Sequence, residues 1–358
     1  MNRKFALLML SVALVTGCSK EGREPKVEQE AETAVLSPQA EAVAMKLSVP
    51  WSIEKDDDTI YISERTGSLV ELSNGKLVRQ DVKFSKTLST AAEAGFLGFI
   101  LHPDFSNNQK AYAYYTYEDN GNQYNRLVLL QKETGGGYLE TDILLDRIPS
   151  GAYHHGGRIK LGPDNKLYIT TGDATVPENA QNLQSLAGKI LRLNLDGSIP
   201  NDNPFAASPV YSYGHRNPQG LVWDDKGNLY ESEHGQSAHD EINTIKAGAN
   251  YGWPQIQGDE KGEGLQNPLY HSGDETWAPS GMAYRDNKLY VATLRGNAVR
   301  QFDLAKKTSK VVVSGYGRIR DVWIEGDSLY FVSNNTDGRG NPDENDDKLY
   351  RISLKDLP

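Results

Sequence analysis

The sequence predicts an all-β fold, namely a six-bladed β-propeller of four-stranded antiparallel blades. The first reason is a short unit, a polar turn followed by a strand with a hydrophobic-Tyr pair, that recurs along most of the chain. The second is composition, because 19 tyrosines favour strands while 34 glycines and 16 prolines imply many turns. The third is that no segment has a long helical period. A pair of β-sandwiches is the alternative, but the even spacing of one repeated unit favours the propeller.

The repeated unit occurs six times in full. The copies are Asp58–Ile62, Lys110–Tyr114, Asn165–Ile169, Gly227–Tyr230, Asn287–Val291 and Asp327–Phe331. Successive copies lie about 40 to 60 residues apart, which is the size of a four-stranded blade with some long loops. A shorter copy, Lys348–Ile352, ends the chain. We expect this strand to complete the blade that the N-terminal segment begins and so to close the ring.

Residues 1–17 have the features of a lipoprotein signal peptide. Asn2-Arg3-Lys4 supply the positive end, and Phe5 to Val15 form an apolar run too short to span a bilayer. The run closes on Val-Thr-Gly-Cys, which resembles the bacterial lipobox with Cys18 as the lipidated residue. A cleaved signal with a chance cysteine is the alternative, and the position of Cys18 at the cleavage site favours the lipoprotein. Because Cys18 is the only cysteine, an intrachain disulfide is excluded.

We expect a flexible tether over 18–45 and one propeller domain over 46–358. The tether is rich in Glu, Lys, Gln, Ala and Pro without a sustained apolar period, and the first compact apolar cluster is Val49–Ile53. The formal charge of −10 argues against nucleic acid and anionic lipid as partners, since both require a basic face. The sequence therefore indicates an exported protein on the periplasmic or extracellular face, held at the membrane only through a lipid on Cys18.

The stretch from Tyr153 to Asp173 carries the main candidate for acid–base chemistry. His154 lies on a Gly-rich loop ahead of a strand, and Asp173 follows that strand, so its carboxylate could return and orient the imidazole. A general base with an orienting carboxylate is the recurring core of proton-abstraction sites. His155 is the rival base, and it points to the opposite side of an extended chain. A turn with surface histidines is the alternative for the whole stretch.

Further polar motifs follow in order, as a propeller site that draws residues from every blade requires. They are HHGGRIKLGPDNKLYITTGD at 154–173, GHRNPQGL at 214–221, DEIN at 240–243, NYGWP at 250–254 and RIRDV at 318–322. Together these motifs resemble the family of soluble quinoprotein aldose dehydrogenases, the glucose/sorbosone dehydrogenases. The similarity runs from about Val49 to the C-terminus with matching spacing. It implies a six-bladed propeller that binds pyrroloquinoline quinone (PQQ) and calcium.

The resemblance assigns the reaction to three residues. His154 would be the general base that takes the proton of the sugar C1 hydroxyl while hydride passes to the quinone, and Asp173 would orient it. Arg216 would stabilise the negative charge that develops on the quinone oxygens. Asn217 and Glu93 would contact the cofactor region, and relatives with a more specialised sugar site carry Gln in place of Glu93.

Arginines are expected to hold the cofactor. PQQ carries three carboxylates, so an acidic protein that binds it must gather arginines locally, and the forked guanidinium suits a carboxylate. The resemblance implies that Arg318 and Arg320 bind these carboxylates and that Arg295 adds to them. A surface salt bridge is the ordinary alternative for each arginine.

The resemblance also implies two calcium sites. The first would be formed by the backbone carbonyls of Gly235 and Gln236 and by the cofactor, and this ion would polarise the reacting carbonyl. Glu241 and Tyr251 resemble ligands of a second, structural calcium. Gln236 stands where relatives commonly have Pro, which is harmless if only the carbonyl binds metal. The acidic stretch 337–347 lacks the twelve-residue calcium-loop pattern and is expected to be a solvated loop.

The expected activity is PQQ- and calcium-dependent oxidation of aldose sugars at C1 to lactones, with electrons passed to an external acceptor. One alternative is a calcium-dependent propeller lactonase, which would have no need of the arginine cluster. The other is a non-catalytic propeller that binds carbohydrate or protein. The sugar, the acceptor and the oligomeric state, for which a homodimer is one candidate, are left open by the sequence.

Overall fold

The computed structural model describes residues 39–358, and these residues form sheets of antiparallel strands with very little helix. Three sheets have four strands in chain order. The first contains β10 (Ile159–Leu161), β11 (Leu167–Thr171), β12 (Lys189–Leu193) and β13 (Val210–Tyr213). The second contains β14 (Pro218–Trp223), β15 (Leu229–Glu233), β16 (Glu241–Ile245) and β17 (Tyr270–His271). The third contains β18 (Pro279–Arg285), β19 (Lys288–Thr293), β20 (Ala298–Asp303) and β21 (Thr308–Ser314).

An eight-stranded sheet follows the order β2-β3-β4-β5-β9-β8-β7-β6. Its first half is β2 (Pro50–Asp56), β3 (Thr59–Glu64), β4 (Ser68–Ser73) and β5 (Lys76–Lys83). Its second half is β6 (Phe96–Leu101), β7 (Lys110–Asp119), β8 (Asn122–Lys132) and β9 (Tyr138–Pro149). The halves join where β5 and β9 pair in parallel at Val82–Tyr138 and Lys83–Leu139. The short helices are α1 (Phe105–Asn108), η1 (Pro177–Ala180) and η2 (Leu354–Asp356).

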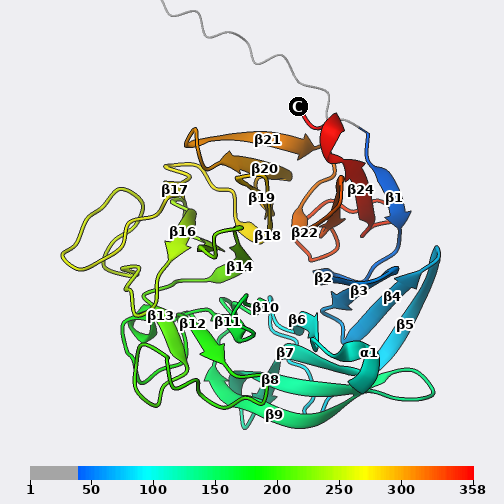
Figure 1. The fold of residues 1–358 in the computed structure, drawn as a ribbon, viewed down its shortest axis with the longest axis horizontal. Coiled ribbons are helices and arrows are strands. Elements are labelled where there is room, and N and C mark those ends of the chain that lie inside the picture. Colours follow the sequence, from blue (N-terminus) through cyan, green and yellow to red (C-terminus); the bar gives the residue numbers. More distant parts are fainter. Residues whose placement is uncertain (1–38) are drawn as a thin grey trace, which may run out of the picture. The chain divides into compact units, whose positions relative to one another are not determined.

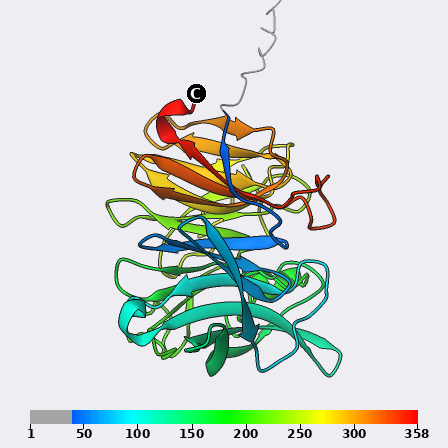
Figure 2. The same cartoon turned by 90° about the vertical axis from the view of Figure 1, so that its right-hand side faces the viewer.

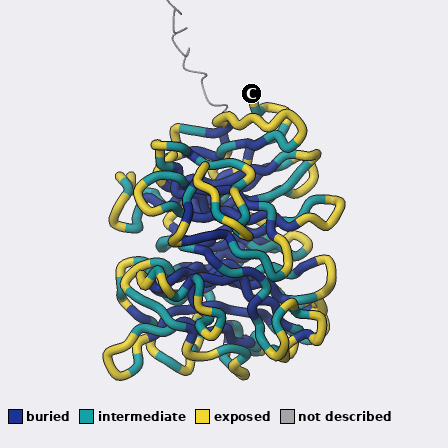
Figure 3. The backbone as a smooth tube through the Cα atoms, turned by 90° about the vertical axis from the view of Figure 1, so that its left-hand side faces the viewer, coloured by how far each residue is buried: buried dark blue, intermediate teal, exposed yellow. Residues whose placement is uncertain are grey.

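The sheets surround a common centre, as Figure 1 shows. The strands nearest to the centre contact one another in the closed order β2, β6, β10, β14, β18, β22 and back to β2. Buried residues predominate on innermost strands such as β2, β6 and β14, whereas the outer strands β5 and β9 carry many exposed residues. Figure 3 shows buried segments in the interior of the molecule and exposed segments mainly at its outer turns. Hydrophobic clusters fill the spaces between neighbouring sheets, and one of them joins Tyr230 and Ile242 to Trp277, Met282 and Phe302. The repeated sheets are therefore held together by apolar burial between them.

The recurring hydrophobic-Tyr pair marks the same position in each repeat. Its tyrosines lie on the strand that pairs with each innermost strand, and all of them are buried: Tyr61 on β3, Tyr112 on β7, Tyr168 on β11, Tyr230 on β15, Tyr290 on β19 and Tyr330 on β23. An aromatic ring with a polar hydroxyl suits this place, because the ring fills the space between sheets while the hydroxyl reaches a polar partner. Tyr168 and Tyr230, for example, donate to Asp164 and Asp224.

The remaining sheet joins the two ends of the described chain. It contains β22 (Ile319–Glu325), β23 (Ser328–Ser333), β24 (Leu349–Ser353) and, outermost, β1 (Glu41–Ala44). Figure 2 shows β1 in blue beside the red C-terminal strand. The sequence predicts the reverse, with the C-terminal strand completing an N-terminal blade, whereas β1 is added to the C-terminal sheet. The sequence also places 41–44 in the tether, whereas these residues pair with β24, so the folded part begins before Lys46.

The expected signal peptide, the lipidated Cys18 and most of the expected tether lie outside the described residues. Within residues 39–358, no helix is long and apolar enough to cross a membrane.

Candidate active site

A cavity of about 350 Å³ lies where the innermost strands begin. Its lining comes from loops and strand ends of nearly every repeat, which is how a propeller assembles a site from residues far apart in sequence. The lining residues are Trp51, Glu93, Leu97, His155, Gly156, Arg216, Gln219, His234, Gly235, Gln236, Ser237, Asp240, Thr276, Ala278, Leu294, Arg295, Arg318, Arg320 and Arg339.

Irregular pairing at the start of the innermost strands aims several side chains into this cavity. The register shifts between Pro50 and Ser52 on β2, and equivalent shifts occur on β6, β14, β18 and β22. A bulge leaves one residue outside the ladder and re-aims its side chain. Trp51, Leu97, Gln219 and Arg320 lie within these shifts, and all four line the cavity.

Arg320 is a buried cation to which no carboxylate of residues 39–358 is hydrogen-bonded. Its guanidinium donates to Gln219 Oε1 at 2.8 Å and to Asn334 Oδ1 at 3.2 and 3.0 Å, all of which are neutral acceptors. Burial lowers the pKa of Arg320 to about 9. A charge removed from water in this way is costly unless an anion compensates it. The position therefore favours an anionic ligand.

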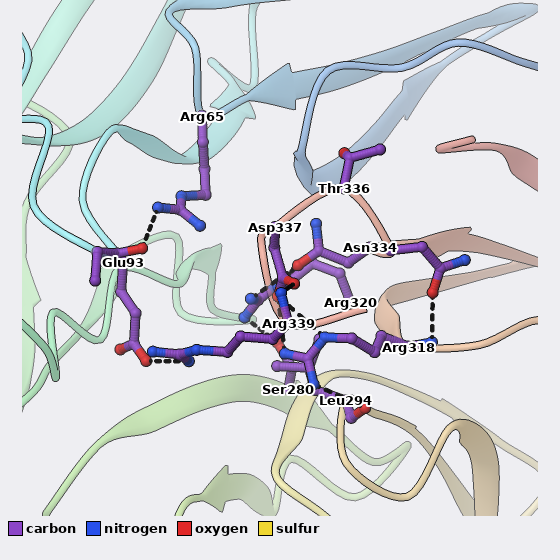
Figure 4. Close-up of polar contacts among 12 residues, drawn as sticks. Arg65, Glu93, Ser280, Leu294, Arg318, Arg320, Asn334, Thr336, Asp337 and Arg339 are labelled. Atoms are coloured by element: carbon purple, nitrogen blue, oxygen red, sulfur yellow. Dashed lines mark hydrogen bonds and ion pairs between the residues drawn. The ribbon is translucent and has the colours of Figure 1, made fainter. Parts of the chain in front are cut away.

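Three more of the arginines expected to hold the cofactor line the same cavity. Arg318 forms a two-pronged ion pair with Asp337 Oδ2, with distances of 3.1 and 2.8 Å, and Figure 4 shows it beside Arg320. Arg216 donates to the carbonyl of His234 at 3.2 Å, and its buried Nε has no hydrogen-bond partner within the described chain. Arg295 lines the cavity from an exposed position. Together with Arg339, these residues outnumber the carboxylates of the lining, Glu93 and Asp240.

His154 and Asp173 form a fixed pair. His154 Nδ1 lies 2.7 Å from Asp173 Oδ1, which also accepts the backbone N–H of Thr175 at 2.8 Å. The indole N–H of Trp253 donates to Asp173 Oδ2 at 2.9 Å. The carboxylate is 1 % exposed and the imidazole 17 %. Asp173 is thus held from both oxygens, and the Nε2 side of His154 remains available for a proton.

The rival base, His155, has a different environment. It is 2 % exposed, its Nδ1 lies 2.7 Å from the hydroxyl of Ser150, and its buried Nε2 has no partner among the described residues. Burial lowers the pKa of His155 to about 4. His155 lines the cavity, whereas His154 and Asp173 do not belong to the lining. Solvent exposure and an orienting carboxylate distinguish His154.

Glu93 and Asn217 both contact the histidine loop. Glu93 lines the cavity, and its Oε2 accepts the backbone N–H of His154 at 3.3 Å. Asn217 is fully buried, and its Oδ1 accepts the N–H of Gly156 at 3.1 Å. Asn217 is not part of the cavity lining, so its contact with a cofactor stays a prediction.

The residues expected to bind the first calcium lie on a tight loop. Gly235 and Gln236 line the cavity, and Asp240 fixes their loop by accepting the N–H groups of Gly235, Trp277 and Ala278 at 2.9, 2.5 and 2.8 Å. A Cβ at Gly235 would lie 1.9 Å from the carbonyl oxygen of Ala238, so only glycine fits there.

The residues expected to bind the second calcium lie next to the first loop. Glu241 and Tyr251 line a smaller pocket that shares Arg216, His234 and Gly235 with the main cavity. Glu233 also lines this pocket, and ligand atoms of His215, Glu231 and Glu233 lie within 4.8 Å of one another, all buried. Asn243 Nδ2 lies within 3.3 Å of a carboxylate oxygen of Glu231, Glu233 and Glu241. Glu231 and Glu233 belong to the polar stretch 231–236 that was expected near the site, but the sequence assigned neither of them a role.

Three further residues of the site were missed. Trp253 occurs in the NYGWP motif and Asp240 in DEIN, so the motifs contained a signal for both. Arg339 lies in the stretch expected to be a solvated loop. That expectation is wrong for Asp337, Arg339 and Asp347. Asp347 is fully buried, the Asp337 side chain is 3 % exposed, and Arg339 lines the cavity.

Comparison with known proteins agrees with the sequence motifs. Residues 47–351 match the family model described as Glucose / Sorbosone dehydrogenase. The chain is 36% identical over 245 residues to quinoprotein glucose dehydrogenase B of Acinetobacter calcoaceticus, with 59% of this chain and 51% of that protein covered. It is 29% identical over 335 residues to an aldose sugar dehydrogenase of Escherichia coli, with 82% and 88% covered. The chain spans about half the length of the first of these relatives.

Solved structures share the fold. A PQQ-bound aldose sugar dehydrogenase from Streptomyces coelicolor superposes with a TM-score of 0.81 and 37% identity, covering 87% of this chain and 96% of that one. The apo-form of the soluble aldose sugar dehydrogenase from Escherichia coli gives a TM-score of 0.77 and 26% identity, covering 88% and 99%.

Proposed function

The chain belongs to the glucose/sorbosone dehydrogenase family, and from this premise we propose that it oxidises aldose sugars at C1 to lactones with PQQ and calcium. Electrons would then pass to an external acceptor. The names of its relatives support a sugar substrate and a quinone cofactor.

The observation that carries this proposal is the buried guanidinium of Arg320, whose partners Gln219 and Asn334 are both neutral. PQQ is a tricarboxylate, and such an anion would supply the missing counter-charge for Arg320 in a cavity where arginines exceed carboxylates. In addition, the buried Nε of Arg216 is a donor without an acceptor among the described residues. A neutral ligand, such as the lactone of the rival hydrolase hypothesis, would leave the buried positive charge of Arg320 uncompensated.

Each protein residue then has a defined task. His154 takes the proton of the C1 hydroxyl at its Nε2, and Asp173 holds the tautomer that leaves this nitrogen free by accepting from Nδ1. Bound PQQ would accept the hydride from C1. Arg216 provides positive charge near the reacting oxygens, and its guanidinium is held over the ring of Trp253, 5.4 Å from the centroid. Arg318, Arg320 and Arg295 bind carboxylates.

Calcium would lie on the loop that Asp240 fixes. The carbonyls of Gly235 and Gln236 are hard oxygen donors of the kind that calcium prefers, and the hydrogen bond from Gly235 N–H to Asp240 holds the loop that carries them. Glu241 and Tyr251 would bind a second ion in the adjacent pocket, where the neighbouring buried carboxylates supply further negative charge.

The proposal extends to architecture and location. Dividing the eight-stranded sheet at the two-pair β5–β9 junction gives six blades of four strands, in keeping with the closed order of the innermost strands. We further propose an exported lipoprotein with a signal peptide over 1–17, lipidation of Cys18 and a periplasmic or extracellular propeller domain.

The test is dye reduction by the full chain with aldoses, before and after addition of PQQ and Ca²⁺. We expect activity that requires both and that falls by about a thousandfold in His154→Ala, with PQQ binding unchanged by fluorescence titration. His155→Ala is the matched variant, and we expect it to retain most of the activity. Greater loss in His155→Ala would reverse the assignment of the base. Absence of PQQ binding would remove the dehydrogenase proposal and leave the lactonase or binding-protein hypothesis.

A further inference from the structure

Arg339 occupies the rim of the cavity. It lines both the main cavity and an adjoining pocket of about 380 Å³, yet 47 % of its side chain is exposed. Its Nη1 donates to Glu93 Oε1 at 2.6 Å, and its guanidinium carbon lies 5.6 Å from the ring centroid of Tyr153. Figure 4 shows the side chain reaching from its own loop to Glu93. The residue therefore connects two loops from opposite ends of the sequence beside His154.

Both of these loops are anchored. Asp337 Oδ1 accepts the N–H of Arg339 at 2.9 Å, while Asp337 Oδ2 binds Arg318. On the other side, Arg65 donates to the carbonyls of Ala92 and Ala94 at 2.7 and 2.9 Å, which fixes the loop on both sides of Glu93. An ordinary surface salt bridge contributes little because two mobile side chains must be ordered. Here the backbones are already fixed, so the pair is a preorganised element of the site.

The pair presents an acceptor and a donor side by side. Burial opposes ionisation of Glu93, but the hydrogen bond from Arg339 prevails and lowers the pKa of Glu93 to about 2, so the group is a carboxylate that only accepts. Within residues 39–358, Arg339 Nε and Nη2 make no hydrogen bond, so they remain as donors. A sugar hydroxyl both donates and accepts, so one placed beside the ion pair could donate to a Glu93 oxygen and accept from the remaining N–H groups of Arg339.

We propose that Arg339 is a specificity-determining residue that, with Glu93, binds the hydroxyl on the carbon next to the reacting carbon of the sugar. The inference rests on the proposed aldose dehydrogenase function. Glu93 Oε2 accepts the backbone N–H of His154, so the pair lies next to the residue that would take the C1 proton. The charges of Glu93 and Arg339 balance, which favours a neutral polyol over an anionic sugar. The substrate class is thus a neutral aldose with a free hydroxyl at C2.

The experiment compares D-glucose with 2-deoxy-D-glucose as substrates for the full chain loaded with PQQ and Ca²⁺. We expect Arg339→Met to lower kcat/KM for D-glucose by about tenfold, mainly through KM, because a charge-assisted hydrogen bond to the C2 hydroxyl is lost. For 2-deoxy-D-glucose the same substitution should change kcat/KM by less than about twofold. Arg147→Met is the control, since Arg147 forms a comparable exposed ion pair, with Asp119, outside the cavity lining.

Equal losses for the two sugars, or no loss for D-glucose, would overturn the assignment of Arg339. Glu93→Leu provides an independent variant if Arg339→Met does not fold, and it should also reduce the preference for D-glucose because the hydroxyl loses its acceptor. A fluorescence titration that measures PQQ binding distinguishes failure of the C2 assignment from failure of the proposed dehydrogenase function. If the wild-type chain binds PQQ and oxidises both sugars equally well, only the C2 assignment is lost. If it does not bind PQQ, the proposed function and this inference are both lost.

Discussion

The indole N–H of Trp253 donates to Asp173 Oδ2 at 2.9 Å, and the other carboxylate oxygen lies 2.7 Å from His154 Nδ1. Trp253 comes from the loop after β16, whereas Asp173 follows β11, so the contact joins two repeats. The same indole ring lies under the guanidinium of Arg216. One aromatic side chain therefore positions both the partner of the proposed base and the cation proposed to stabilise charge.

Replacement of Trp253 by Phe tests this positioning. The ring that supports Arg216 is retained, but Asp173 Oδ2 loses its donor, so the carboxylate is less firmly held against His154. We expect kcat to fall by about tenfold with little change in KM. The hydrogen bond does not contact the substrate, but it holds the carboxylate that stabilises His154 when the imidazole takes up the proton. Steady-state kinetics with an aldose measure the effect.

Trp323→Phe is the matched control for this change, because the buried Nε1 of Trp323 has no hydrogen-bond partner among the described residues. Its kcat should equal that of the wild type. Equal activity in Trp253→Phe and Trp323→Phe would mean that Asp173 needs no indole donor.

Arg320→Met separates ligand binding from stability. The wild-type apoprotein keeps a buried guanidinium with neutral partners, so its removal should leave the melting temperature unchanged or raise it. Affinity for PQQ should fall by about a hundredfold, because two charge-assisted hydrogen bonds to a carboxylate are lost. Fluorescence titration with PQQ and thermal unfolding with and without it measure the two effects.

Arg285→Met is the control, because Arg285 forms an exposed ion pair with Asp286, and this substitution should change neither quantity. Strong destabilisation of apo Arg320→Met would instead indicate a structural role.

The sequence predicted the residue types of the site better than its geometry. The placement of Asp173 near His154 could be expected because a strand follows the His154 loop and ends at Asp173, and Arg216, Arg318 and Arg320 could be grouped through their motifs. The bulges that aim Trp51, Leu97 and Arg320 inward depend on pairing register, which one strand alone does not specify. Arg339 was missed because charge density suggested a solvated loop, whereas Asp337 and Asp347 are buried and anchor it. β1 was missed because four residues carry little pattern and their partner strand lies at the other end of the chain.

Lys189 should make stability depend on pH. Its ammonium is fully buried and donates to the carbonyls of Asn179, Ala180 and Ala187 at 2.7, 3.0 and 2.7 Å, and no carboxylate in the described part of the chain pairs with it. Burial lowers the pKa of Lys189 from 10.5 to about 7. Between these two values the unfolded chain binds more protons than the folded chain, so this group makes the free energy of unfolding rise with pH. Below about pH 7 both states are protonated, and the penalty is fully present.

Comparison of wild type with Lys189→Met by denaturant unfolding, from pH 7 to pH 10, measures this contribution. We expect the wild type to gain stability relative to the variant across that window, with Lys226→Met, at an exposed position, following the wild type. A difference between wild type and Lys189→Met that is constant with pH would show that Lys189 keeps its ordinary pKa.

Removal of β1 should weaken the closure of the ring. A chain that starts at Lys46 loses the strand that pairs with β24, together with the buried Ala40 and Ala44 and the hydrogen bond from Ala40 N to the hydroxyl of Tyr316 at 2.7 Å. We expect the melting temperature to fall by several degrees and the protein to self-associate, because β24 becomes an exposed edge. Thermal unfolding and light scattering measure these effects. A chain that starts at Gln39 keeps β1 and serves as the control. Equal stability of the two truncated chains would mean that β22, β23 and β24 close the ring without β1.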